Sequence, residues 1–227
     1  MHAWKRVSIS ARSCLRLPVS ESLILHEDPC SGNCYKIKLT AALLGLGLET
    51  RQYDILKGET RTPEFLRNVN ANGRIPVLQI GEGAEARFLP ESNAACWYLA
   101  SGTHLVPQTP FEQADALRWM FFEQYNHEPN VATLRFWTKI VGEANWNEEQ
   151  RAQEPAKRAN GQAALALLDQ ELAERRFLCG DTVTLADLVL FPYTHKAEEG
   201  GFSLQPLAHM CDWIGRIESL EGFIAMD

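Results

Sequence analysis

The sequence predicts an α/β unit with a mixed sheet over residues 21–102, followed by an all-helical domain over residues 111–227. Three observations support this fold class. Strand-like and helical segments alternate in the first part in the order β-α-β-α-β-β-α, which is typical of an α/β unit that ends in a hairpin and a helix. Residues 103–110 contain two prolines and are expected to form a linker. Every segment after this linker has a helical pattern.

The first segments run from one strand to a second strand. Ser22–His26 is a short apolar run that predicts a buried strand, and the turn-forming residues Asp28–Asn33 follow it. Cys34–Leu46 is apolar on most sides and ends in glycines, which favours a buried helix with a glycine stop. Glu49–Ile55 alternates weakly and is expected to form the second strand.

The rest of the α/β unit is expected to be a helix, a hairpin and a final helix. Thr62, followed by a proline and an acid, predicts a helix start, and Asn70–Gly73 ends that helix. Ile75–Ile80 and Arg87–Leu89 flank a glycine turn and predict the two strands of a hairpin. Glu91–Leu99 has apolar residues at helical spacing and predicts a helix with one buried face.

The second half contains segments of helical pattern only. Phe111–Asn126 and Asn130–Val141 are rich in aromatic residues, and Glu148–Glu174 places its leucines on one face. Thr184 and Asp187 have the spacing of a capping box, which predicts the start of another helix.

Charge and composition exclude several classes of protein. The chain carries 29 acidic and 22 basic side chains, for a net charge of −7, which disfavours a nucleic-acid partner. No apolar run approaches the roughly 18 residues that a membrane helix needs, so no membrane partner is expected. The six cysteines form neither a zinc pattern nor a disulfide scaffold. We therefore expect reduced thiols, no metal and a cytoplasmic location.

The first twenty residues differ from the rest of the chain because they hold four basic side chains and no acid. Their composition is similar to that of a transit peptide, but they lack the apolar core of a secretory signal. We favour a disordered N-terminal extension over residues 1–20, and an organelle-targeting segment is the alternative.

Ser31 and Asn33 belong to a polar turn before the first buried helix. The unpaired N–H groups and the positive partial charge of a helix N-terminus favour a thiolate placed there. Lowering the pKa of a free thiol by about 2 units requires roughly 2.7 kcal/mol, which a hydroxyl donor and backbone N–H groups could supply. The alternative is that either side chain only caps the helix.

Two further features of the α/β unit are suited to binding a peptide. A cis peptide bond before Pro76 would expose the backbone of Val77 to an extended peptide, whereas a trans proline on an edge strand is the alternative. Ser92 at a helix start can bind a carboxylate, and Glu91 can pair with an ammonium, which together suits an amino-acid head group. The alternative is a capping serine beside a first-turn acid.

In this order and at these spacings, the segments resemble the cytosolic glutathione transferases over residues 22–225, in particular bacterial Ser/Asn-type members similar to the theta and nu classes. The resemblance implies a thioredoxin-like first domain, an all-helical second domain, a homodimer and a role in detoxification. It implies glutathione as substrate or cosubstrate. The matching segments are Ser31–Lys36, Leu56–Thr60, Thr62–Phe65, Asn72–Val77, Leu89–Ser92, Tyr98–Ala100 and Thr184–Asp187.

The resemblance also implies roles for individual residues. Ser31, helped by Asn33, would stabilise the glutathione thiolate for attack on an electrophilic carbon. In the family, a cis-proline loop pairs with the cysteinyl backbone, a Glu-Ser pair holds the γ-glutamyl group, and basic side chains meet the glycine carboxylate. Carried onto this sequence, these glutathione-binding roles fall on Lys57, Arg74, Ile75, Pro76, Val77, Glu91 and Ser92.

The aromatic stretch Arg118–Asn126 is expected to reach a small electrophilic or hydrophobic second substrate. Trp119, Phe122 and Tyr125 would line that pocket, and core packing is the alternative.

Other activities are compatible with the same glutathione site. One is a glutathione-dependent disulfide or peroxide reductase or an isomerase, because cysteine-type members use a thiol near this turn. We expect Cys30 and Cys34 to be bystanders here, since free cysteines usually behave as small buried apolar residues. Another is a non-catalytic binding module, which fold alone does not exclude.

Overall fold

The first half of the chain is built around a four-stranded mixed sheet. The computed structural model describes residues 21–226, so the expectations for residues 1–20 lie outside the described residues. β1 (Leu23–Glu27) pairs in parallel with β2 (Glu49–Gln52) and antiparallel with β3 (Val77–Ile80), which also pairs with β4 (Arg87–Pro90). The strand order is β2-β1-β3-β4, and the predicted mixed sheet is confirmed.

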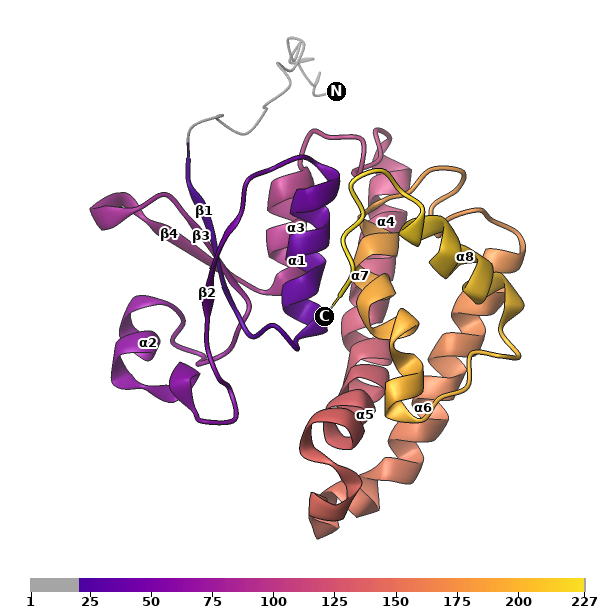
Figure 1. The fold of residues 1–227 in the computed structure, drawn as a ribbon. Helices are drawn as coiled ribbons and strands as arrows, with labels where there is room; N and C mark the ends of the chain where they lie inside the picture. The colour runs from indigo at the N-terminus through magenta and orange to yellow at the C-terminus, as the bar shows by residue number, and fades with distance from the viewer. Residues whose placement is uncertain (1–20, 227) are drawn as a thin grey trace, which may run out of the picture.

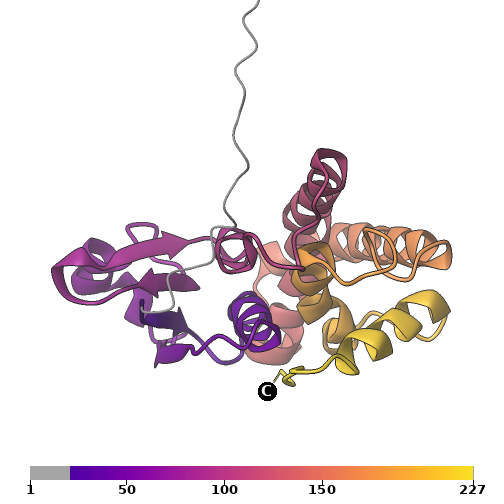
Figure 2. The ribbon, with the colours of Figure 1, turned by 90° about the horizontal axis from the view of Figure 1, so that it is seen from above.

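Two helices separate this sheet from the helical half. α1 (Gly32–Leu43) and α3 (Ser92–Ala100) lie side by side against one face of the sheet, and α2 (Pro63–Asn68) lies on the other side (Figure 1). Seen from above in Figure 2, α1 stands between the sheet and the helical half. Because α1 also contacts the helical half, it is covered on most sides, which explains why the sequence is apolar nearly all round it.

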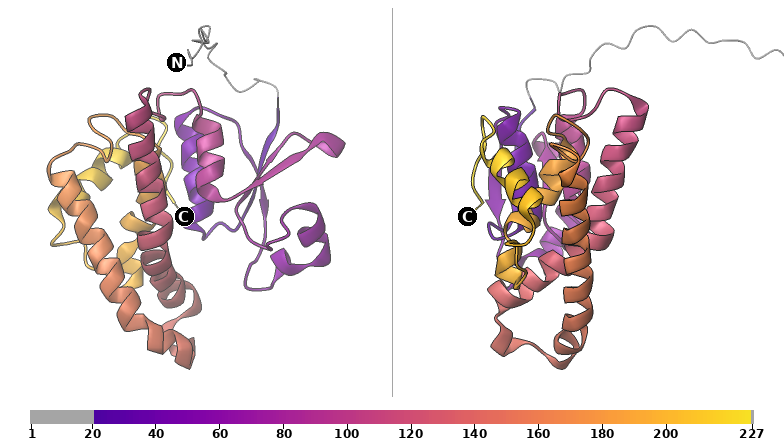
Figure 3. Two further views of the ribbon diagram at one scale, coloured as in Figure 1. Left: turned by 180° about the vertical axis from the view of Figure 1, so that it is seen from behind. Right: turned by 90° about the vertical axis from the view of Figure 1, so that its right-hand side faces the viewer.

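The second half consists of helices, as expected. A continuous helical rod contains α4 (Pro110–Phe122) and α5 (Thr133–Arg135), and Figure 3 shows its course from behind and from the side. The remaining helices are α6 (Glu148–Ala173), α7 (Leu185–His195) and α8 (Ala208–Glu218).

The rod corrects one expectation, because the segments Phe111–Asn126 and Asn130–Val141, expected separately, form one continuous helical rod. A π-helical stretch, Glu123–Ala132, joins α4 to α5, and a second one, Phe136–Val141, follows α5. Pro129 lies inside the first stretch and has no backbone N–H to donate. The wider π turn accommodates this missing donor without ending the helix.

The centre of the helical half is α7, which is buried along almost its whole length. The predicted capping box is confirmed: Asp187 accepts hydrogen bonds from the backbone N–H and hydroxyl of Thr184. The same carboxylate accepts from the indole of Trp213 in α8. α7 also packs against α1, which brings Tyr193 to the N-terminus of α1.

Two strands are shorter than the sequence predicts. β2 ends at Gln52 rather than at residue 55, because the side chain of Asp54 accepts hydrogen bonds from the backbone N–H groups of Leu56 and Lys57 and so turns the chain. β3 begins at Val77 rather than at residue 75, directly after Pro76.

Candidate functional site

A cavity with a volume of about 890 Å³ lies between the two halves of the molecule. Its walls in the first half come from the turn after β1, the segment after β2 and the residues before β3. Its walls in the helical half come from the π-helical rod and α7. The residues that line it include Cys30, Ser31, Asn33, Arg74, Ile75, Glu128, Arg135, Phe136, Trp137 and Tyr193.

Ser31 is the N-cap of α1 and is half-buried in the cavity wall. Its hydroxyl oxygen accepts a hydrogen bond from the backbone N–H of Cys34 at 3.4 Å. This contact uses a lone pair, so the hydroxyl hydrogen remains available for donation. The capping role is therefore present in the structure, and it is compatible with a second role in the cavity.

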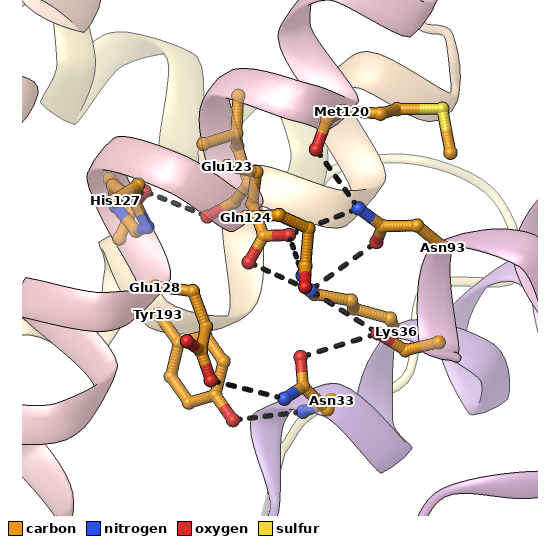
Figure 4. Close-up of polar contacts among 12 residues, drawn as sticks. Asn33, Lys36, Asn93, Met120, Glu123, Gln124, His127, Glu128 and Tyr193 are labelled. Atoms are coloured by element: carbon orange, nitrogen blue, oxygen red, sulfur yellow. Dashed lines mark hydrogen bonds and ion pairs between the residues drawn. The ribbon is translucent and has the colours of Figure 1, made fainter. Parts of the chain in front are cut away.

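Asn33 is held by three partners that come from different parts of the chain (Figure 4). Its backbone N–H donates to the hydroxyl of Tyr193 at 3.1 Å. Its side-chain Nδ2 donates to Oε1 of Glu128 at 3.5 Å, and its Oδ1 accepts from the hydroxyl of Ser92 at 3.3 Å. The two predicted residues Asn33 and Ser92 are thus hydrogen-bonded to each other, and Tyr193 and Glu128 of the helical half contact Asn33.

A buried ion pair lies behind this cluster (Figure 4). The ammonium of Lys36, on α1, is 2.8 Å from Oε1 of Glu123, on the π-helical stretch, and both side chains are 0% exposed. Lys36 also donates to Asn93 at 3.4 Å and to Ser92 at 3.5 Å, and Asn93 in turn donates to Glu123. The pair links the two halves of the molecule through a network whose donors and acceptors are largely matched.

The peptide bond between Ile75 and Pro76 is cis. Arg74 and Ile75 line the cavity, whereas Val77 is fully buried and lies opposite His26 and Pro90 in the sheet. Ile75 is therefore nearer to the open space than Val77 is.

The remaining predicted glutathione-binding residues are more exposed. Glu91 has a positive φ of 71° immediately before α3, and its side chain is exposed. Lys57 is exposed and forms an ion pair with Asp54 at 2.9 Å. Ile55 and Leu56, next to it in the chain, line the cavity.

The aromatic residues of the cavity differ from those expected for a second substrate. Trp119 is 0% exposed in the core, while Phe122 and Tyr125 line a separate, smaller hollow. The aromatic walls of the large cavity in the helical half are Phe136, Trp137 and Tyr193. The reason is that the rod turns through π-helical stretches between these two sets, which changes the face that later residues present.

The two cysteines of the turn have different surroundings. Cys34 is buried, and burial raises the pKa of its thiol to about 12, so it remains protonated at neutral pH. Cys30 is exposed at the cavity wall, and its backbone carbonyl accepts a hydrogen bond from Arg135 at 3.0 Å.

Sequence reasoning missed Lys36, Glu123, Glu128 and Tyr193. One signal of a buried ion pair was available in the sequence, because Lys36 lies in a helix predicted to be buried on most sides. A buried lysine needs an anionic partner. Nothing in the local pattern identified that partner, because the pairing is between distant segments.

Within residues 21–226, no group of three His, Cys, Asp or Glu side chains is arranged to hold a metal ion. In the same range, no helix combines the length and the apolar character that crossing a bilayer requires.

The sequence matches two family models, one within each half of the chain. Residues 30–101 match "Glutathione S-transferase, N-terminal domain", and residues 144–199 match "Glutathione S-transferase, C-terminal domain".

Similar proteins include bacterial, fungal and animal chains. A crystal structure of glutathione S-transferase from Pseudomonas fluorescens has 39% identity and a TM-score of 0.83, covering 90% of this chain and 98% of that one. The glutathione S-transferase-like protein LUC7 from Fusarium is 33% identical over 72% of each chain. Elongation factor 1-gamma from Rattus norvegicus is 37% identical over 59% of this chain, but the match spans only 28% of that longer protein.

Proposed function

This chain belongs to the glutathione S-transferase family, and we propose that it binds glutathione in the large cavity and activates its thiol for attack on an electrophilic carbon. One observation carries the proposal: Ser31 and Asn33 stand at the N-terminus of α1, and both line the cavity. We further propose, on the same family basis, that the protein is a cytoplasmic homodimer.

The chemistry follows from the environment of Ser31. Its hydroxyl donates to the sulfur, while the N-terminus of α1 supplies a positive partial charge. Together they stabilise the thiolate relative to the thiol, and lowering the pKa by about 2 units corresponds to roughly 2.7 kcal/mol. The aromatic walls formed by Phe136 and Trp137 suit an apolar electrophile held beside the sulfur.

We propose an extended pose for the rest of the tripeptide. The γ-glutamyl group meets Glu91 and Ser92 at the start of α3. The cysteinyl backbone meets the chain around Pro76, and the glycine carboxylate meets Arg74. The exposure of Glu91 and the positions of Arg74 and Ile75 in the cavity wall support this orientation.

The test is Ser31→Ala with glutathione and a chromogenic aryl halide. Removing the hydroxyl is expected to raise the pKa of the bound thiol by about 1–2 units and to lower kcat/KM about 10- to 100-fold near neutral pH. The pKa is read from the ultraviolet absorbance of the bound thiolate at a series of pH values.

Ser219→Ala makes the same chemical change in an exposed serine at the end of α8 and serves as the matched control. Unfolding curves of both variants separate the loss of a helix cap from the loss of catalysis. Wild-type kcat/KM and an unchanged thiol pKa in Ser31→Ala would show that Ser31 has no role in activation.

A non-catalytic binding module is the second candidate, favoured by the similarity to elongation factor 1-gamma. Retention on immobilised glutathione, reduced by Glu91→Ala, together with turnover of an electrophile, would support the enzyme. Binding of glutathione without turnover of a panel of electrophiles would support the module.

A glutathione-dependent reductase is a third candidate because Cys30 is exposed in the cavity wall. Disulfide or peroxide reduction that is lost in Cys30→Ser, with conjugation retained, would favour it.

A further inference from the structure

The cavity wall beside Asn33 contains a carboxylate, that of Glu128, which has no role in the proposed mechanism. Glu128 lies on the π-helical stretch, lines the cavity, and accepts the hydrogen bond from Nδ2 of Asn33. Figure 4 shows the carboxylate of Glu128 and the phenol of Tyr193 converging on Asn33. Within residues 21–226, no lysine or arginine lies within ion-pairing distance of Glu128.

The charged groups around Glu128 leave it a stronger base than an ordinary carboxylate. Burial raises its pKa, and the nearby carboxylate of Glu123 raises it further. Lys36, Asn33 and Arg74 act in the opposite direction, and the net pKa is raised. Lys36 is already paired with Glu123, and burial raises the pKa of Tyr193, which keeps its hydroxyl neutral.

This carboxylate conflicts with a thiolate held by Ser31 and Asn33. Two anions that share the amide donor of Asn33 repel each other, and the partial burial of Glu128 strengthens that repulsion. The conflict disappears if the carboxylate becomes neutral when the thiolate forms. A carboxylate whose pKa is raised above its ordinary value is a better proton acceptor for that exchange than an ordinary carboxylate.

We propose that Glu128 accepts the thiol proton of bound glutathione; this inference rests on the proposed function. The S–H bond breaks, its electron pair stays on sulfur, and the proton forms an O–H bond with the Glu128 carboxylate. One negative charge moves from oxygen to sulfur, so the net charge of the cavity does not change. The thiolate then forms the C–S bond, and the leaving group departs with the electron pair of the bond that breaks. Glu128 finally returns its proton to the leaving group or to water.

The test is Glu128→Gln, because glutamine keeps an oxygen that can accept from Asn33 but cannot take the proton. Two signals are measured as glutathione binds: the ultraviolet absorbance of the thiolate, and the protons released to the buffer. Proton release is obtained by calorimetry in two buffers of different ionisation enthalpy. Glu198→Gln removes one negative charge from an exposed position in the helical half and is the matched control.

In the wild type and in Glu198→Gln, thiolate is expected to form with much less than one proton released per thiolate. In Glu128→Gln, each thiolate should release one proton, and kcat/KM below the thiol pKa should fall by about 100-fold. The pH–rate profile of that variant should move to higher pH.

The results that would contradict a proton-accepting role of Glu128 can be told apart by experiment. If Glu128 only repels the thiolate, Glu128→Gln will lower the bound thiol pKa and raise kcat/KM. If it only supports Asn33, the variant will match the wild type in proton release and rate. Either result overturns the role of Glu128 while leaving the proposed function intact. Failure of the wild type to bind glutathione would overturn both.

Discussion

At the scale of single residues, Lys36 is the clearest case of a side chain that needs its partner. Its ammonium and the carboxylate of Glu123 are both withdrawn from water, and each would carry a large desolvation penalty alone. Ser92 and Asn93 satisfy further hydrogen bonds of the ammonium. Removing only one of the two side chains is therefore expected to lower the free energy of unfolding by more than the intact pair contributes to it.

Lys36→Met is expected to lower the free energy of unfolding by about 3–5 kcal/mol, because it leaves the carboxylate of Glu123 buried without a cation. Adding Glu123→Leu should recover part of this loss, since the uncompensated charge is then gone. Urea denaturation of the two single variants and the double variant measures the coupling. Additive losses would mean that the two side chains contribute independently.

Polar residues at the starts of helices were predictable from the sequence because the signal is local. Ser31, Asn33 and Ser92 are polar residues at helix starts, and local patterns predicted them. Their partners Glu128 and Tyr193 lie 95 and 160 residues away from Asn33 in the chain. Such contacts depend on how the two halves pack, which no local pattern encodes.

At the scale of elements, the approach of α7 to α1 depends on Gly32. A Cβ atom at this position would lie 2.6 Å from Cε1 of Tyr193, closer than real contacts allow. The missing side chain lets the ring of Tyr193 pack against the first turn of α1, where its hydroxyl accepts from Asn33. Gly32, at the start of α1, is therefore required for the close contact between α1 and α7.

Gly32→Ala is expected to destabilise the protein by about 1–3 kcal/mol, because the ring of Tyr193 must move. Gly215→Ala is the matched control: this glycine is in α8 with nothing within 4 Å of the added Cβ, so the change should stabilise by about 0.4–1 kcal/mol. Thermal unfolding of both variants makes the comparison. Equal shifts in Tm would contradict close packing at Gly32.

The element order was predictable, whereas the course of the long rod was not. Alternation, caps and glycine stops gave every strand and the starts of most helices, because these signals are local. Phe111–Asn126 and Asn130–Val141 were expected as two helical segments, but the chain joins them through a π-helical stretch that contains Pro129. The aromatic residues that line the cavity in the helical half, Phe136, Trp137 and Tyr193, lie outside the stretch Arg118–Asn126 that the sequence singled out.

At the scale of the whole molecule, two buried histidines and one partly buried histidine link stability to pH. Burial lowers the pKa of His26, His127 and His195, to about 3 for His127 and to about 4 for His195. They lie in the sheet, on the π-helical stretch and at the end of α7, so both halves are affected. Each histidine is neutral in the folded protein at pH values where the unfolded chain already binds a proton.

The sign follows from these lowered values. The contribution of His127 is fully present above the unfolded pKa of about 6.5 and is lost progressively as the pH falls toward the folded pKa of about 3. Between pH 6.5 and 5, the loss from His127 alone is about 2 kcal/mol. His127→Gln, which can still bond to Thr194, should lose correspondingly less stability over this interval in urea denaturation. Parallel pH curves for wild type and variant would rule this account out.

The cavity between the halves gives any bound molecule a further effect. One side of the cavity is formed by the turn before α1, and the opposite side is formed by the π-helical rod and α7. A tripeptide bound there would contact both halves. Because it binds only the folded protein, its binding free energy would add to the free energy of unfolding. Cells rich in such a ligand would therefore keep the protein in a more protease-resistant form than the empty protein alone attains.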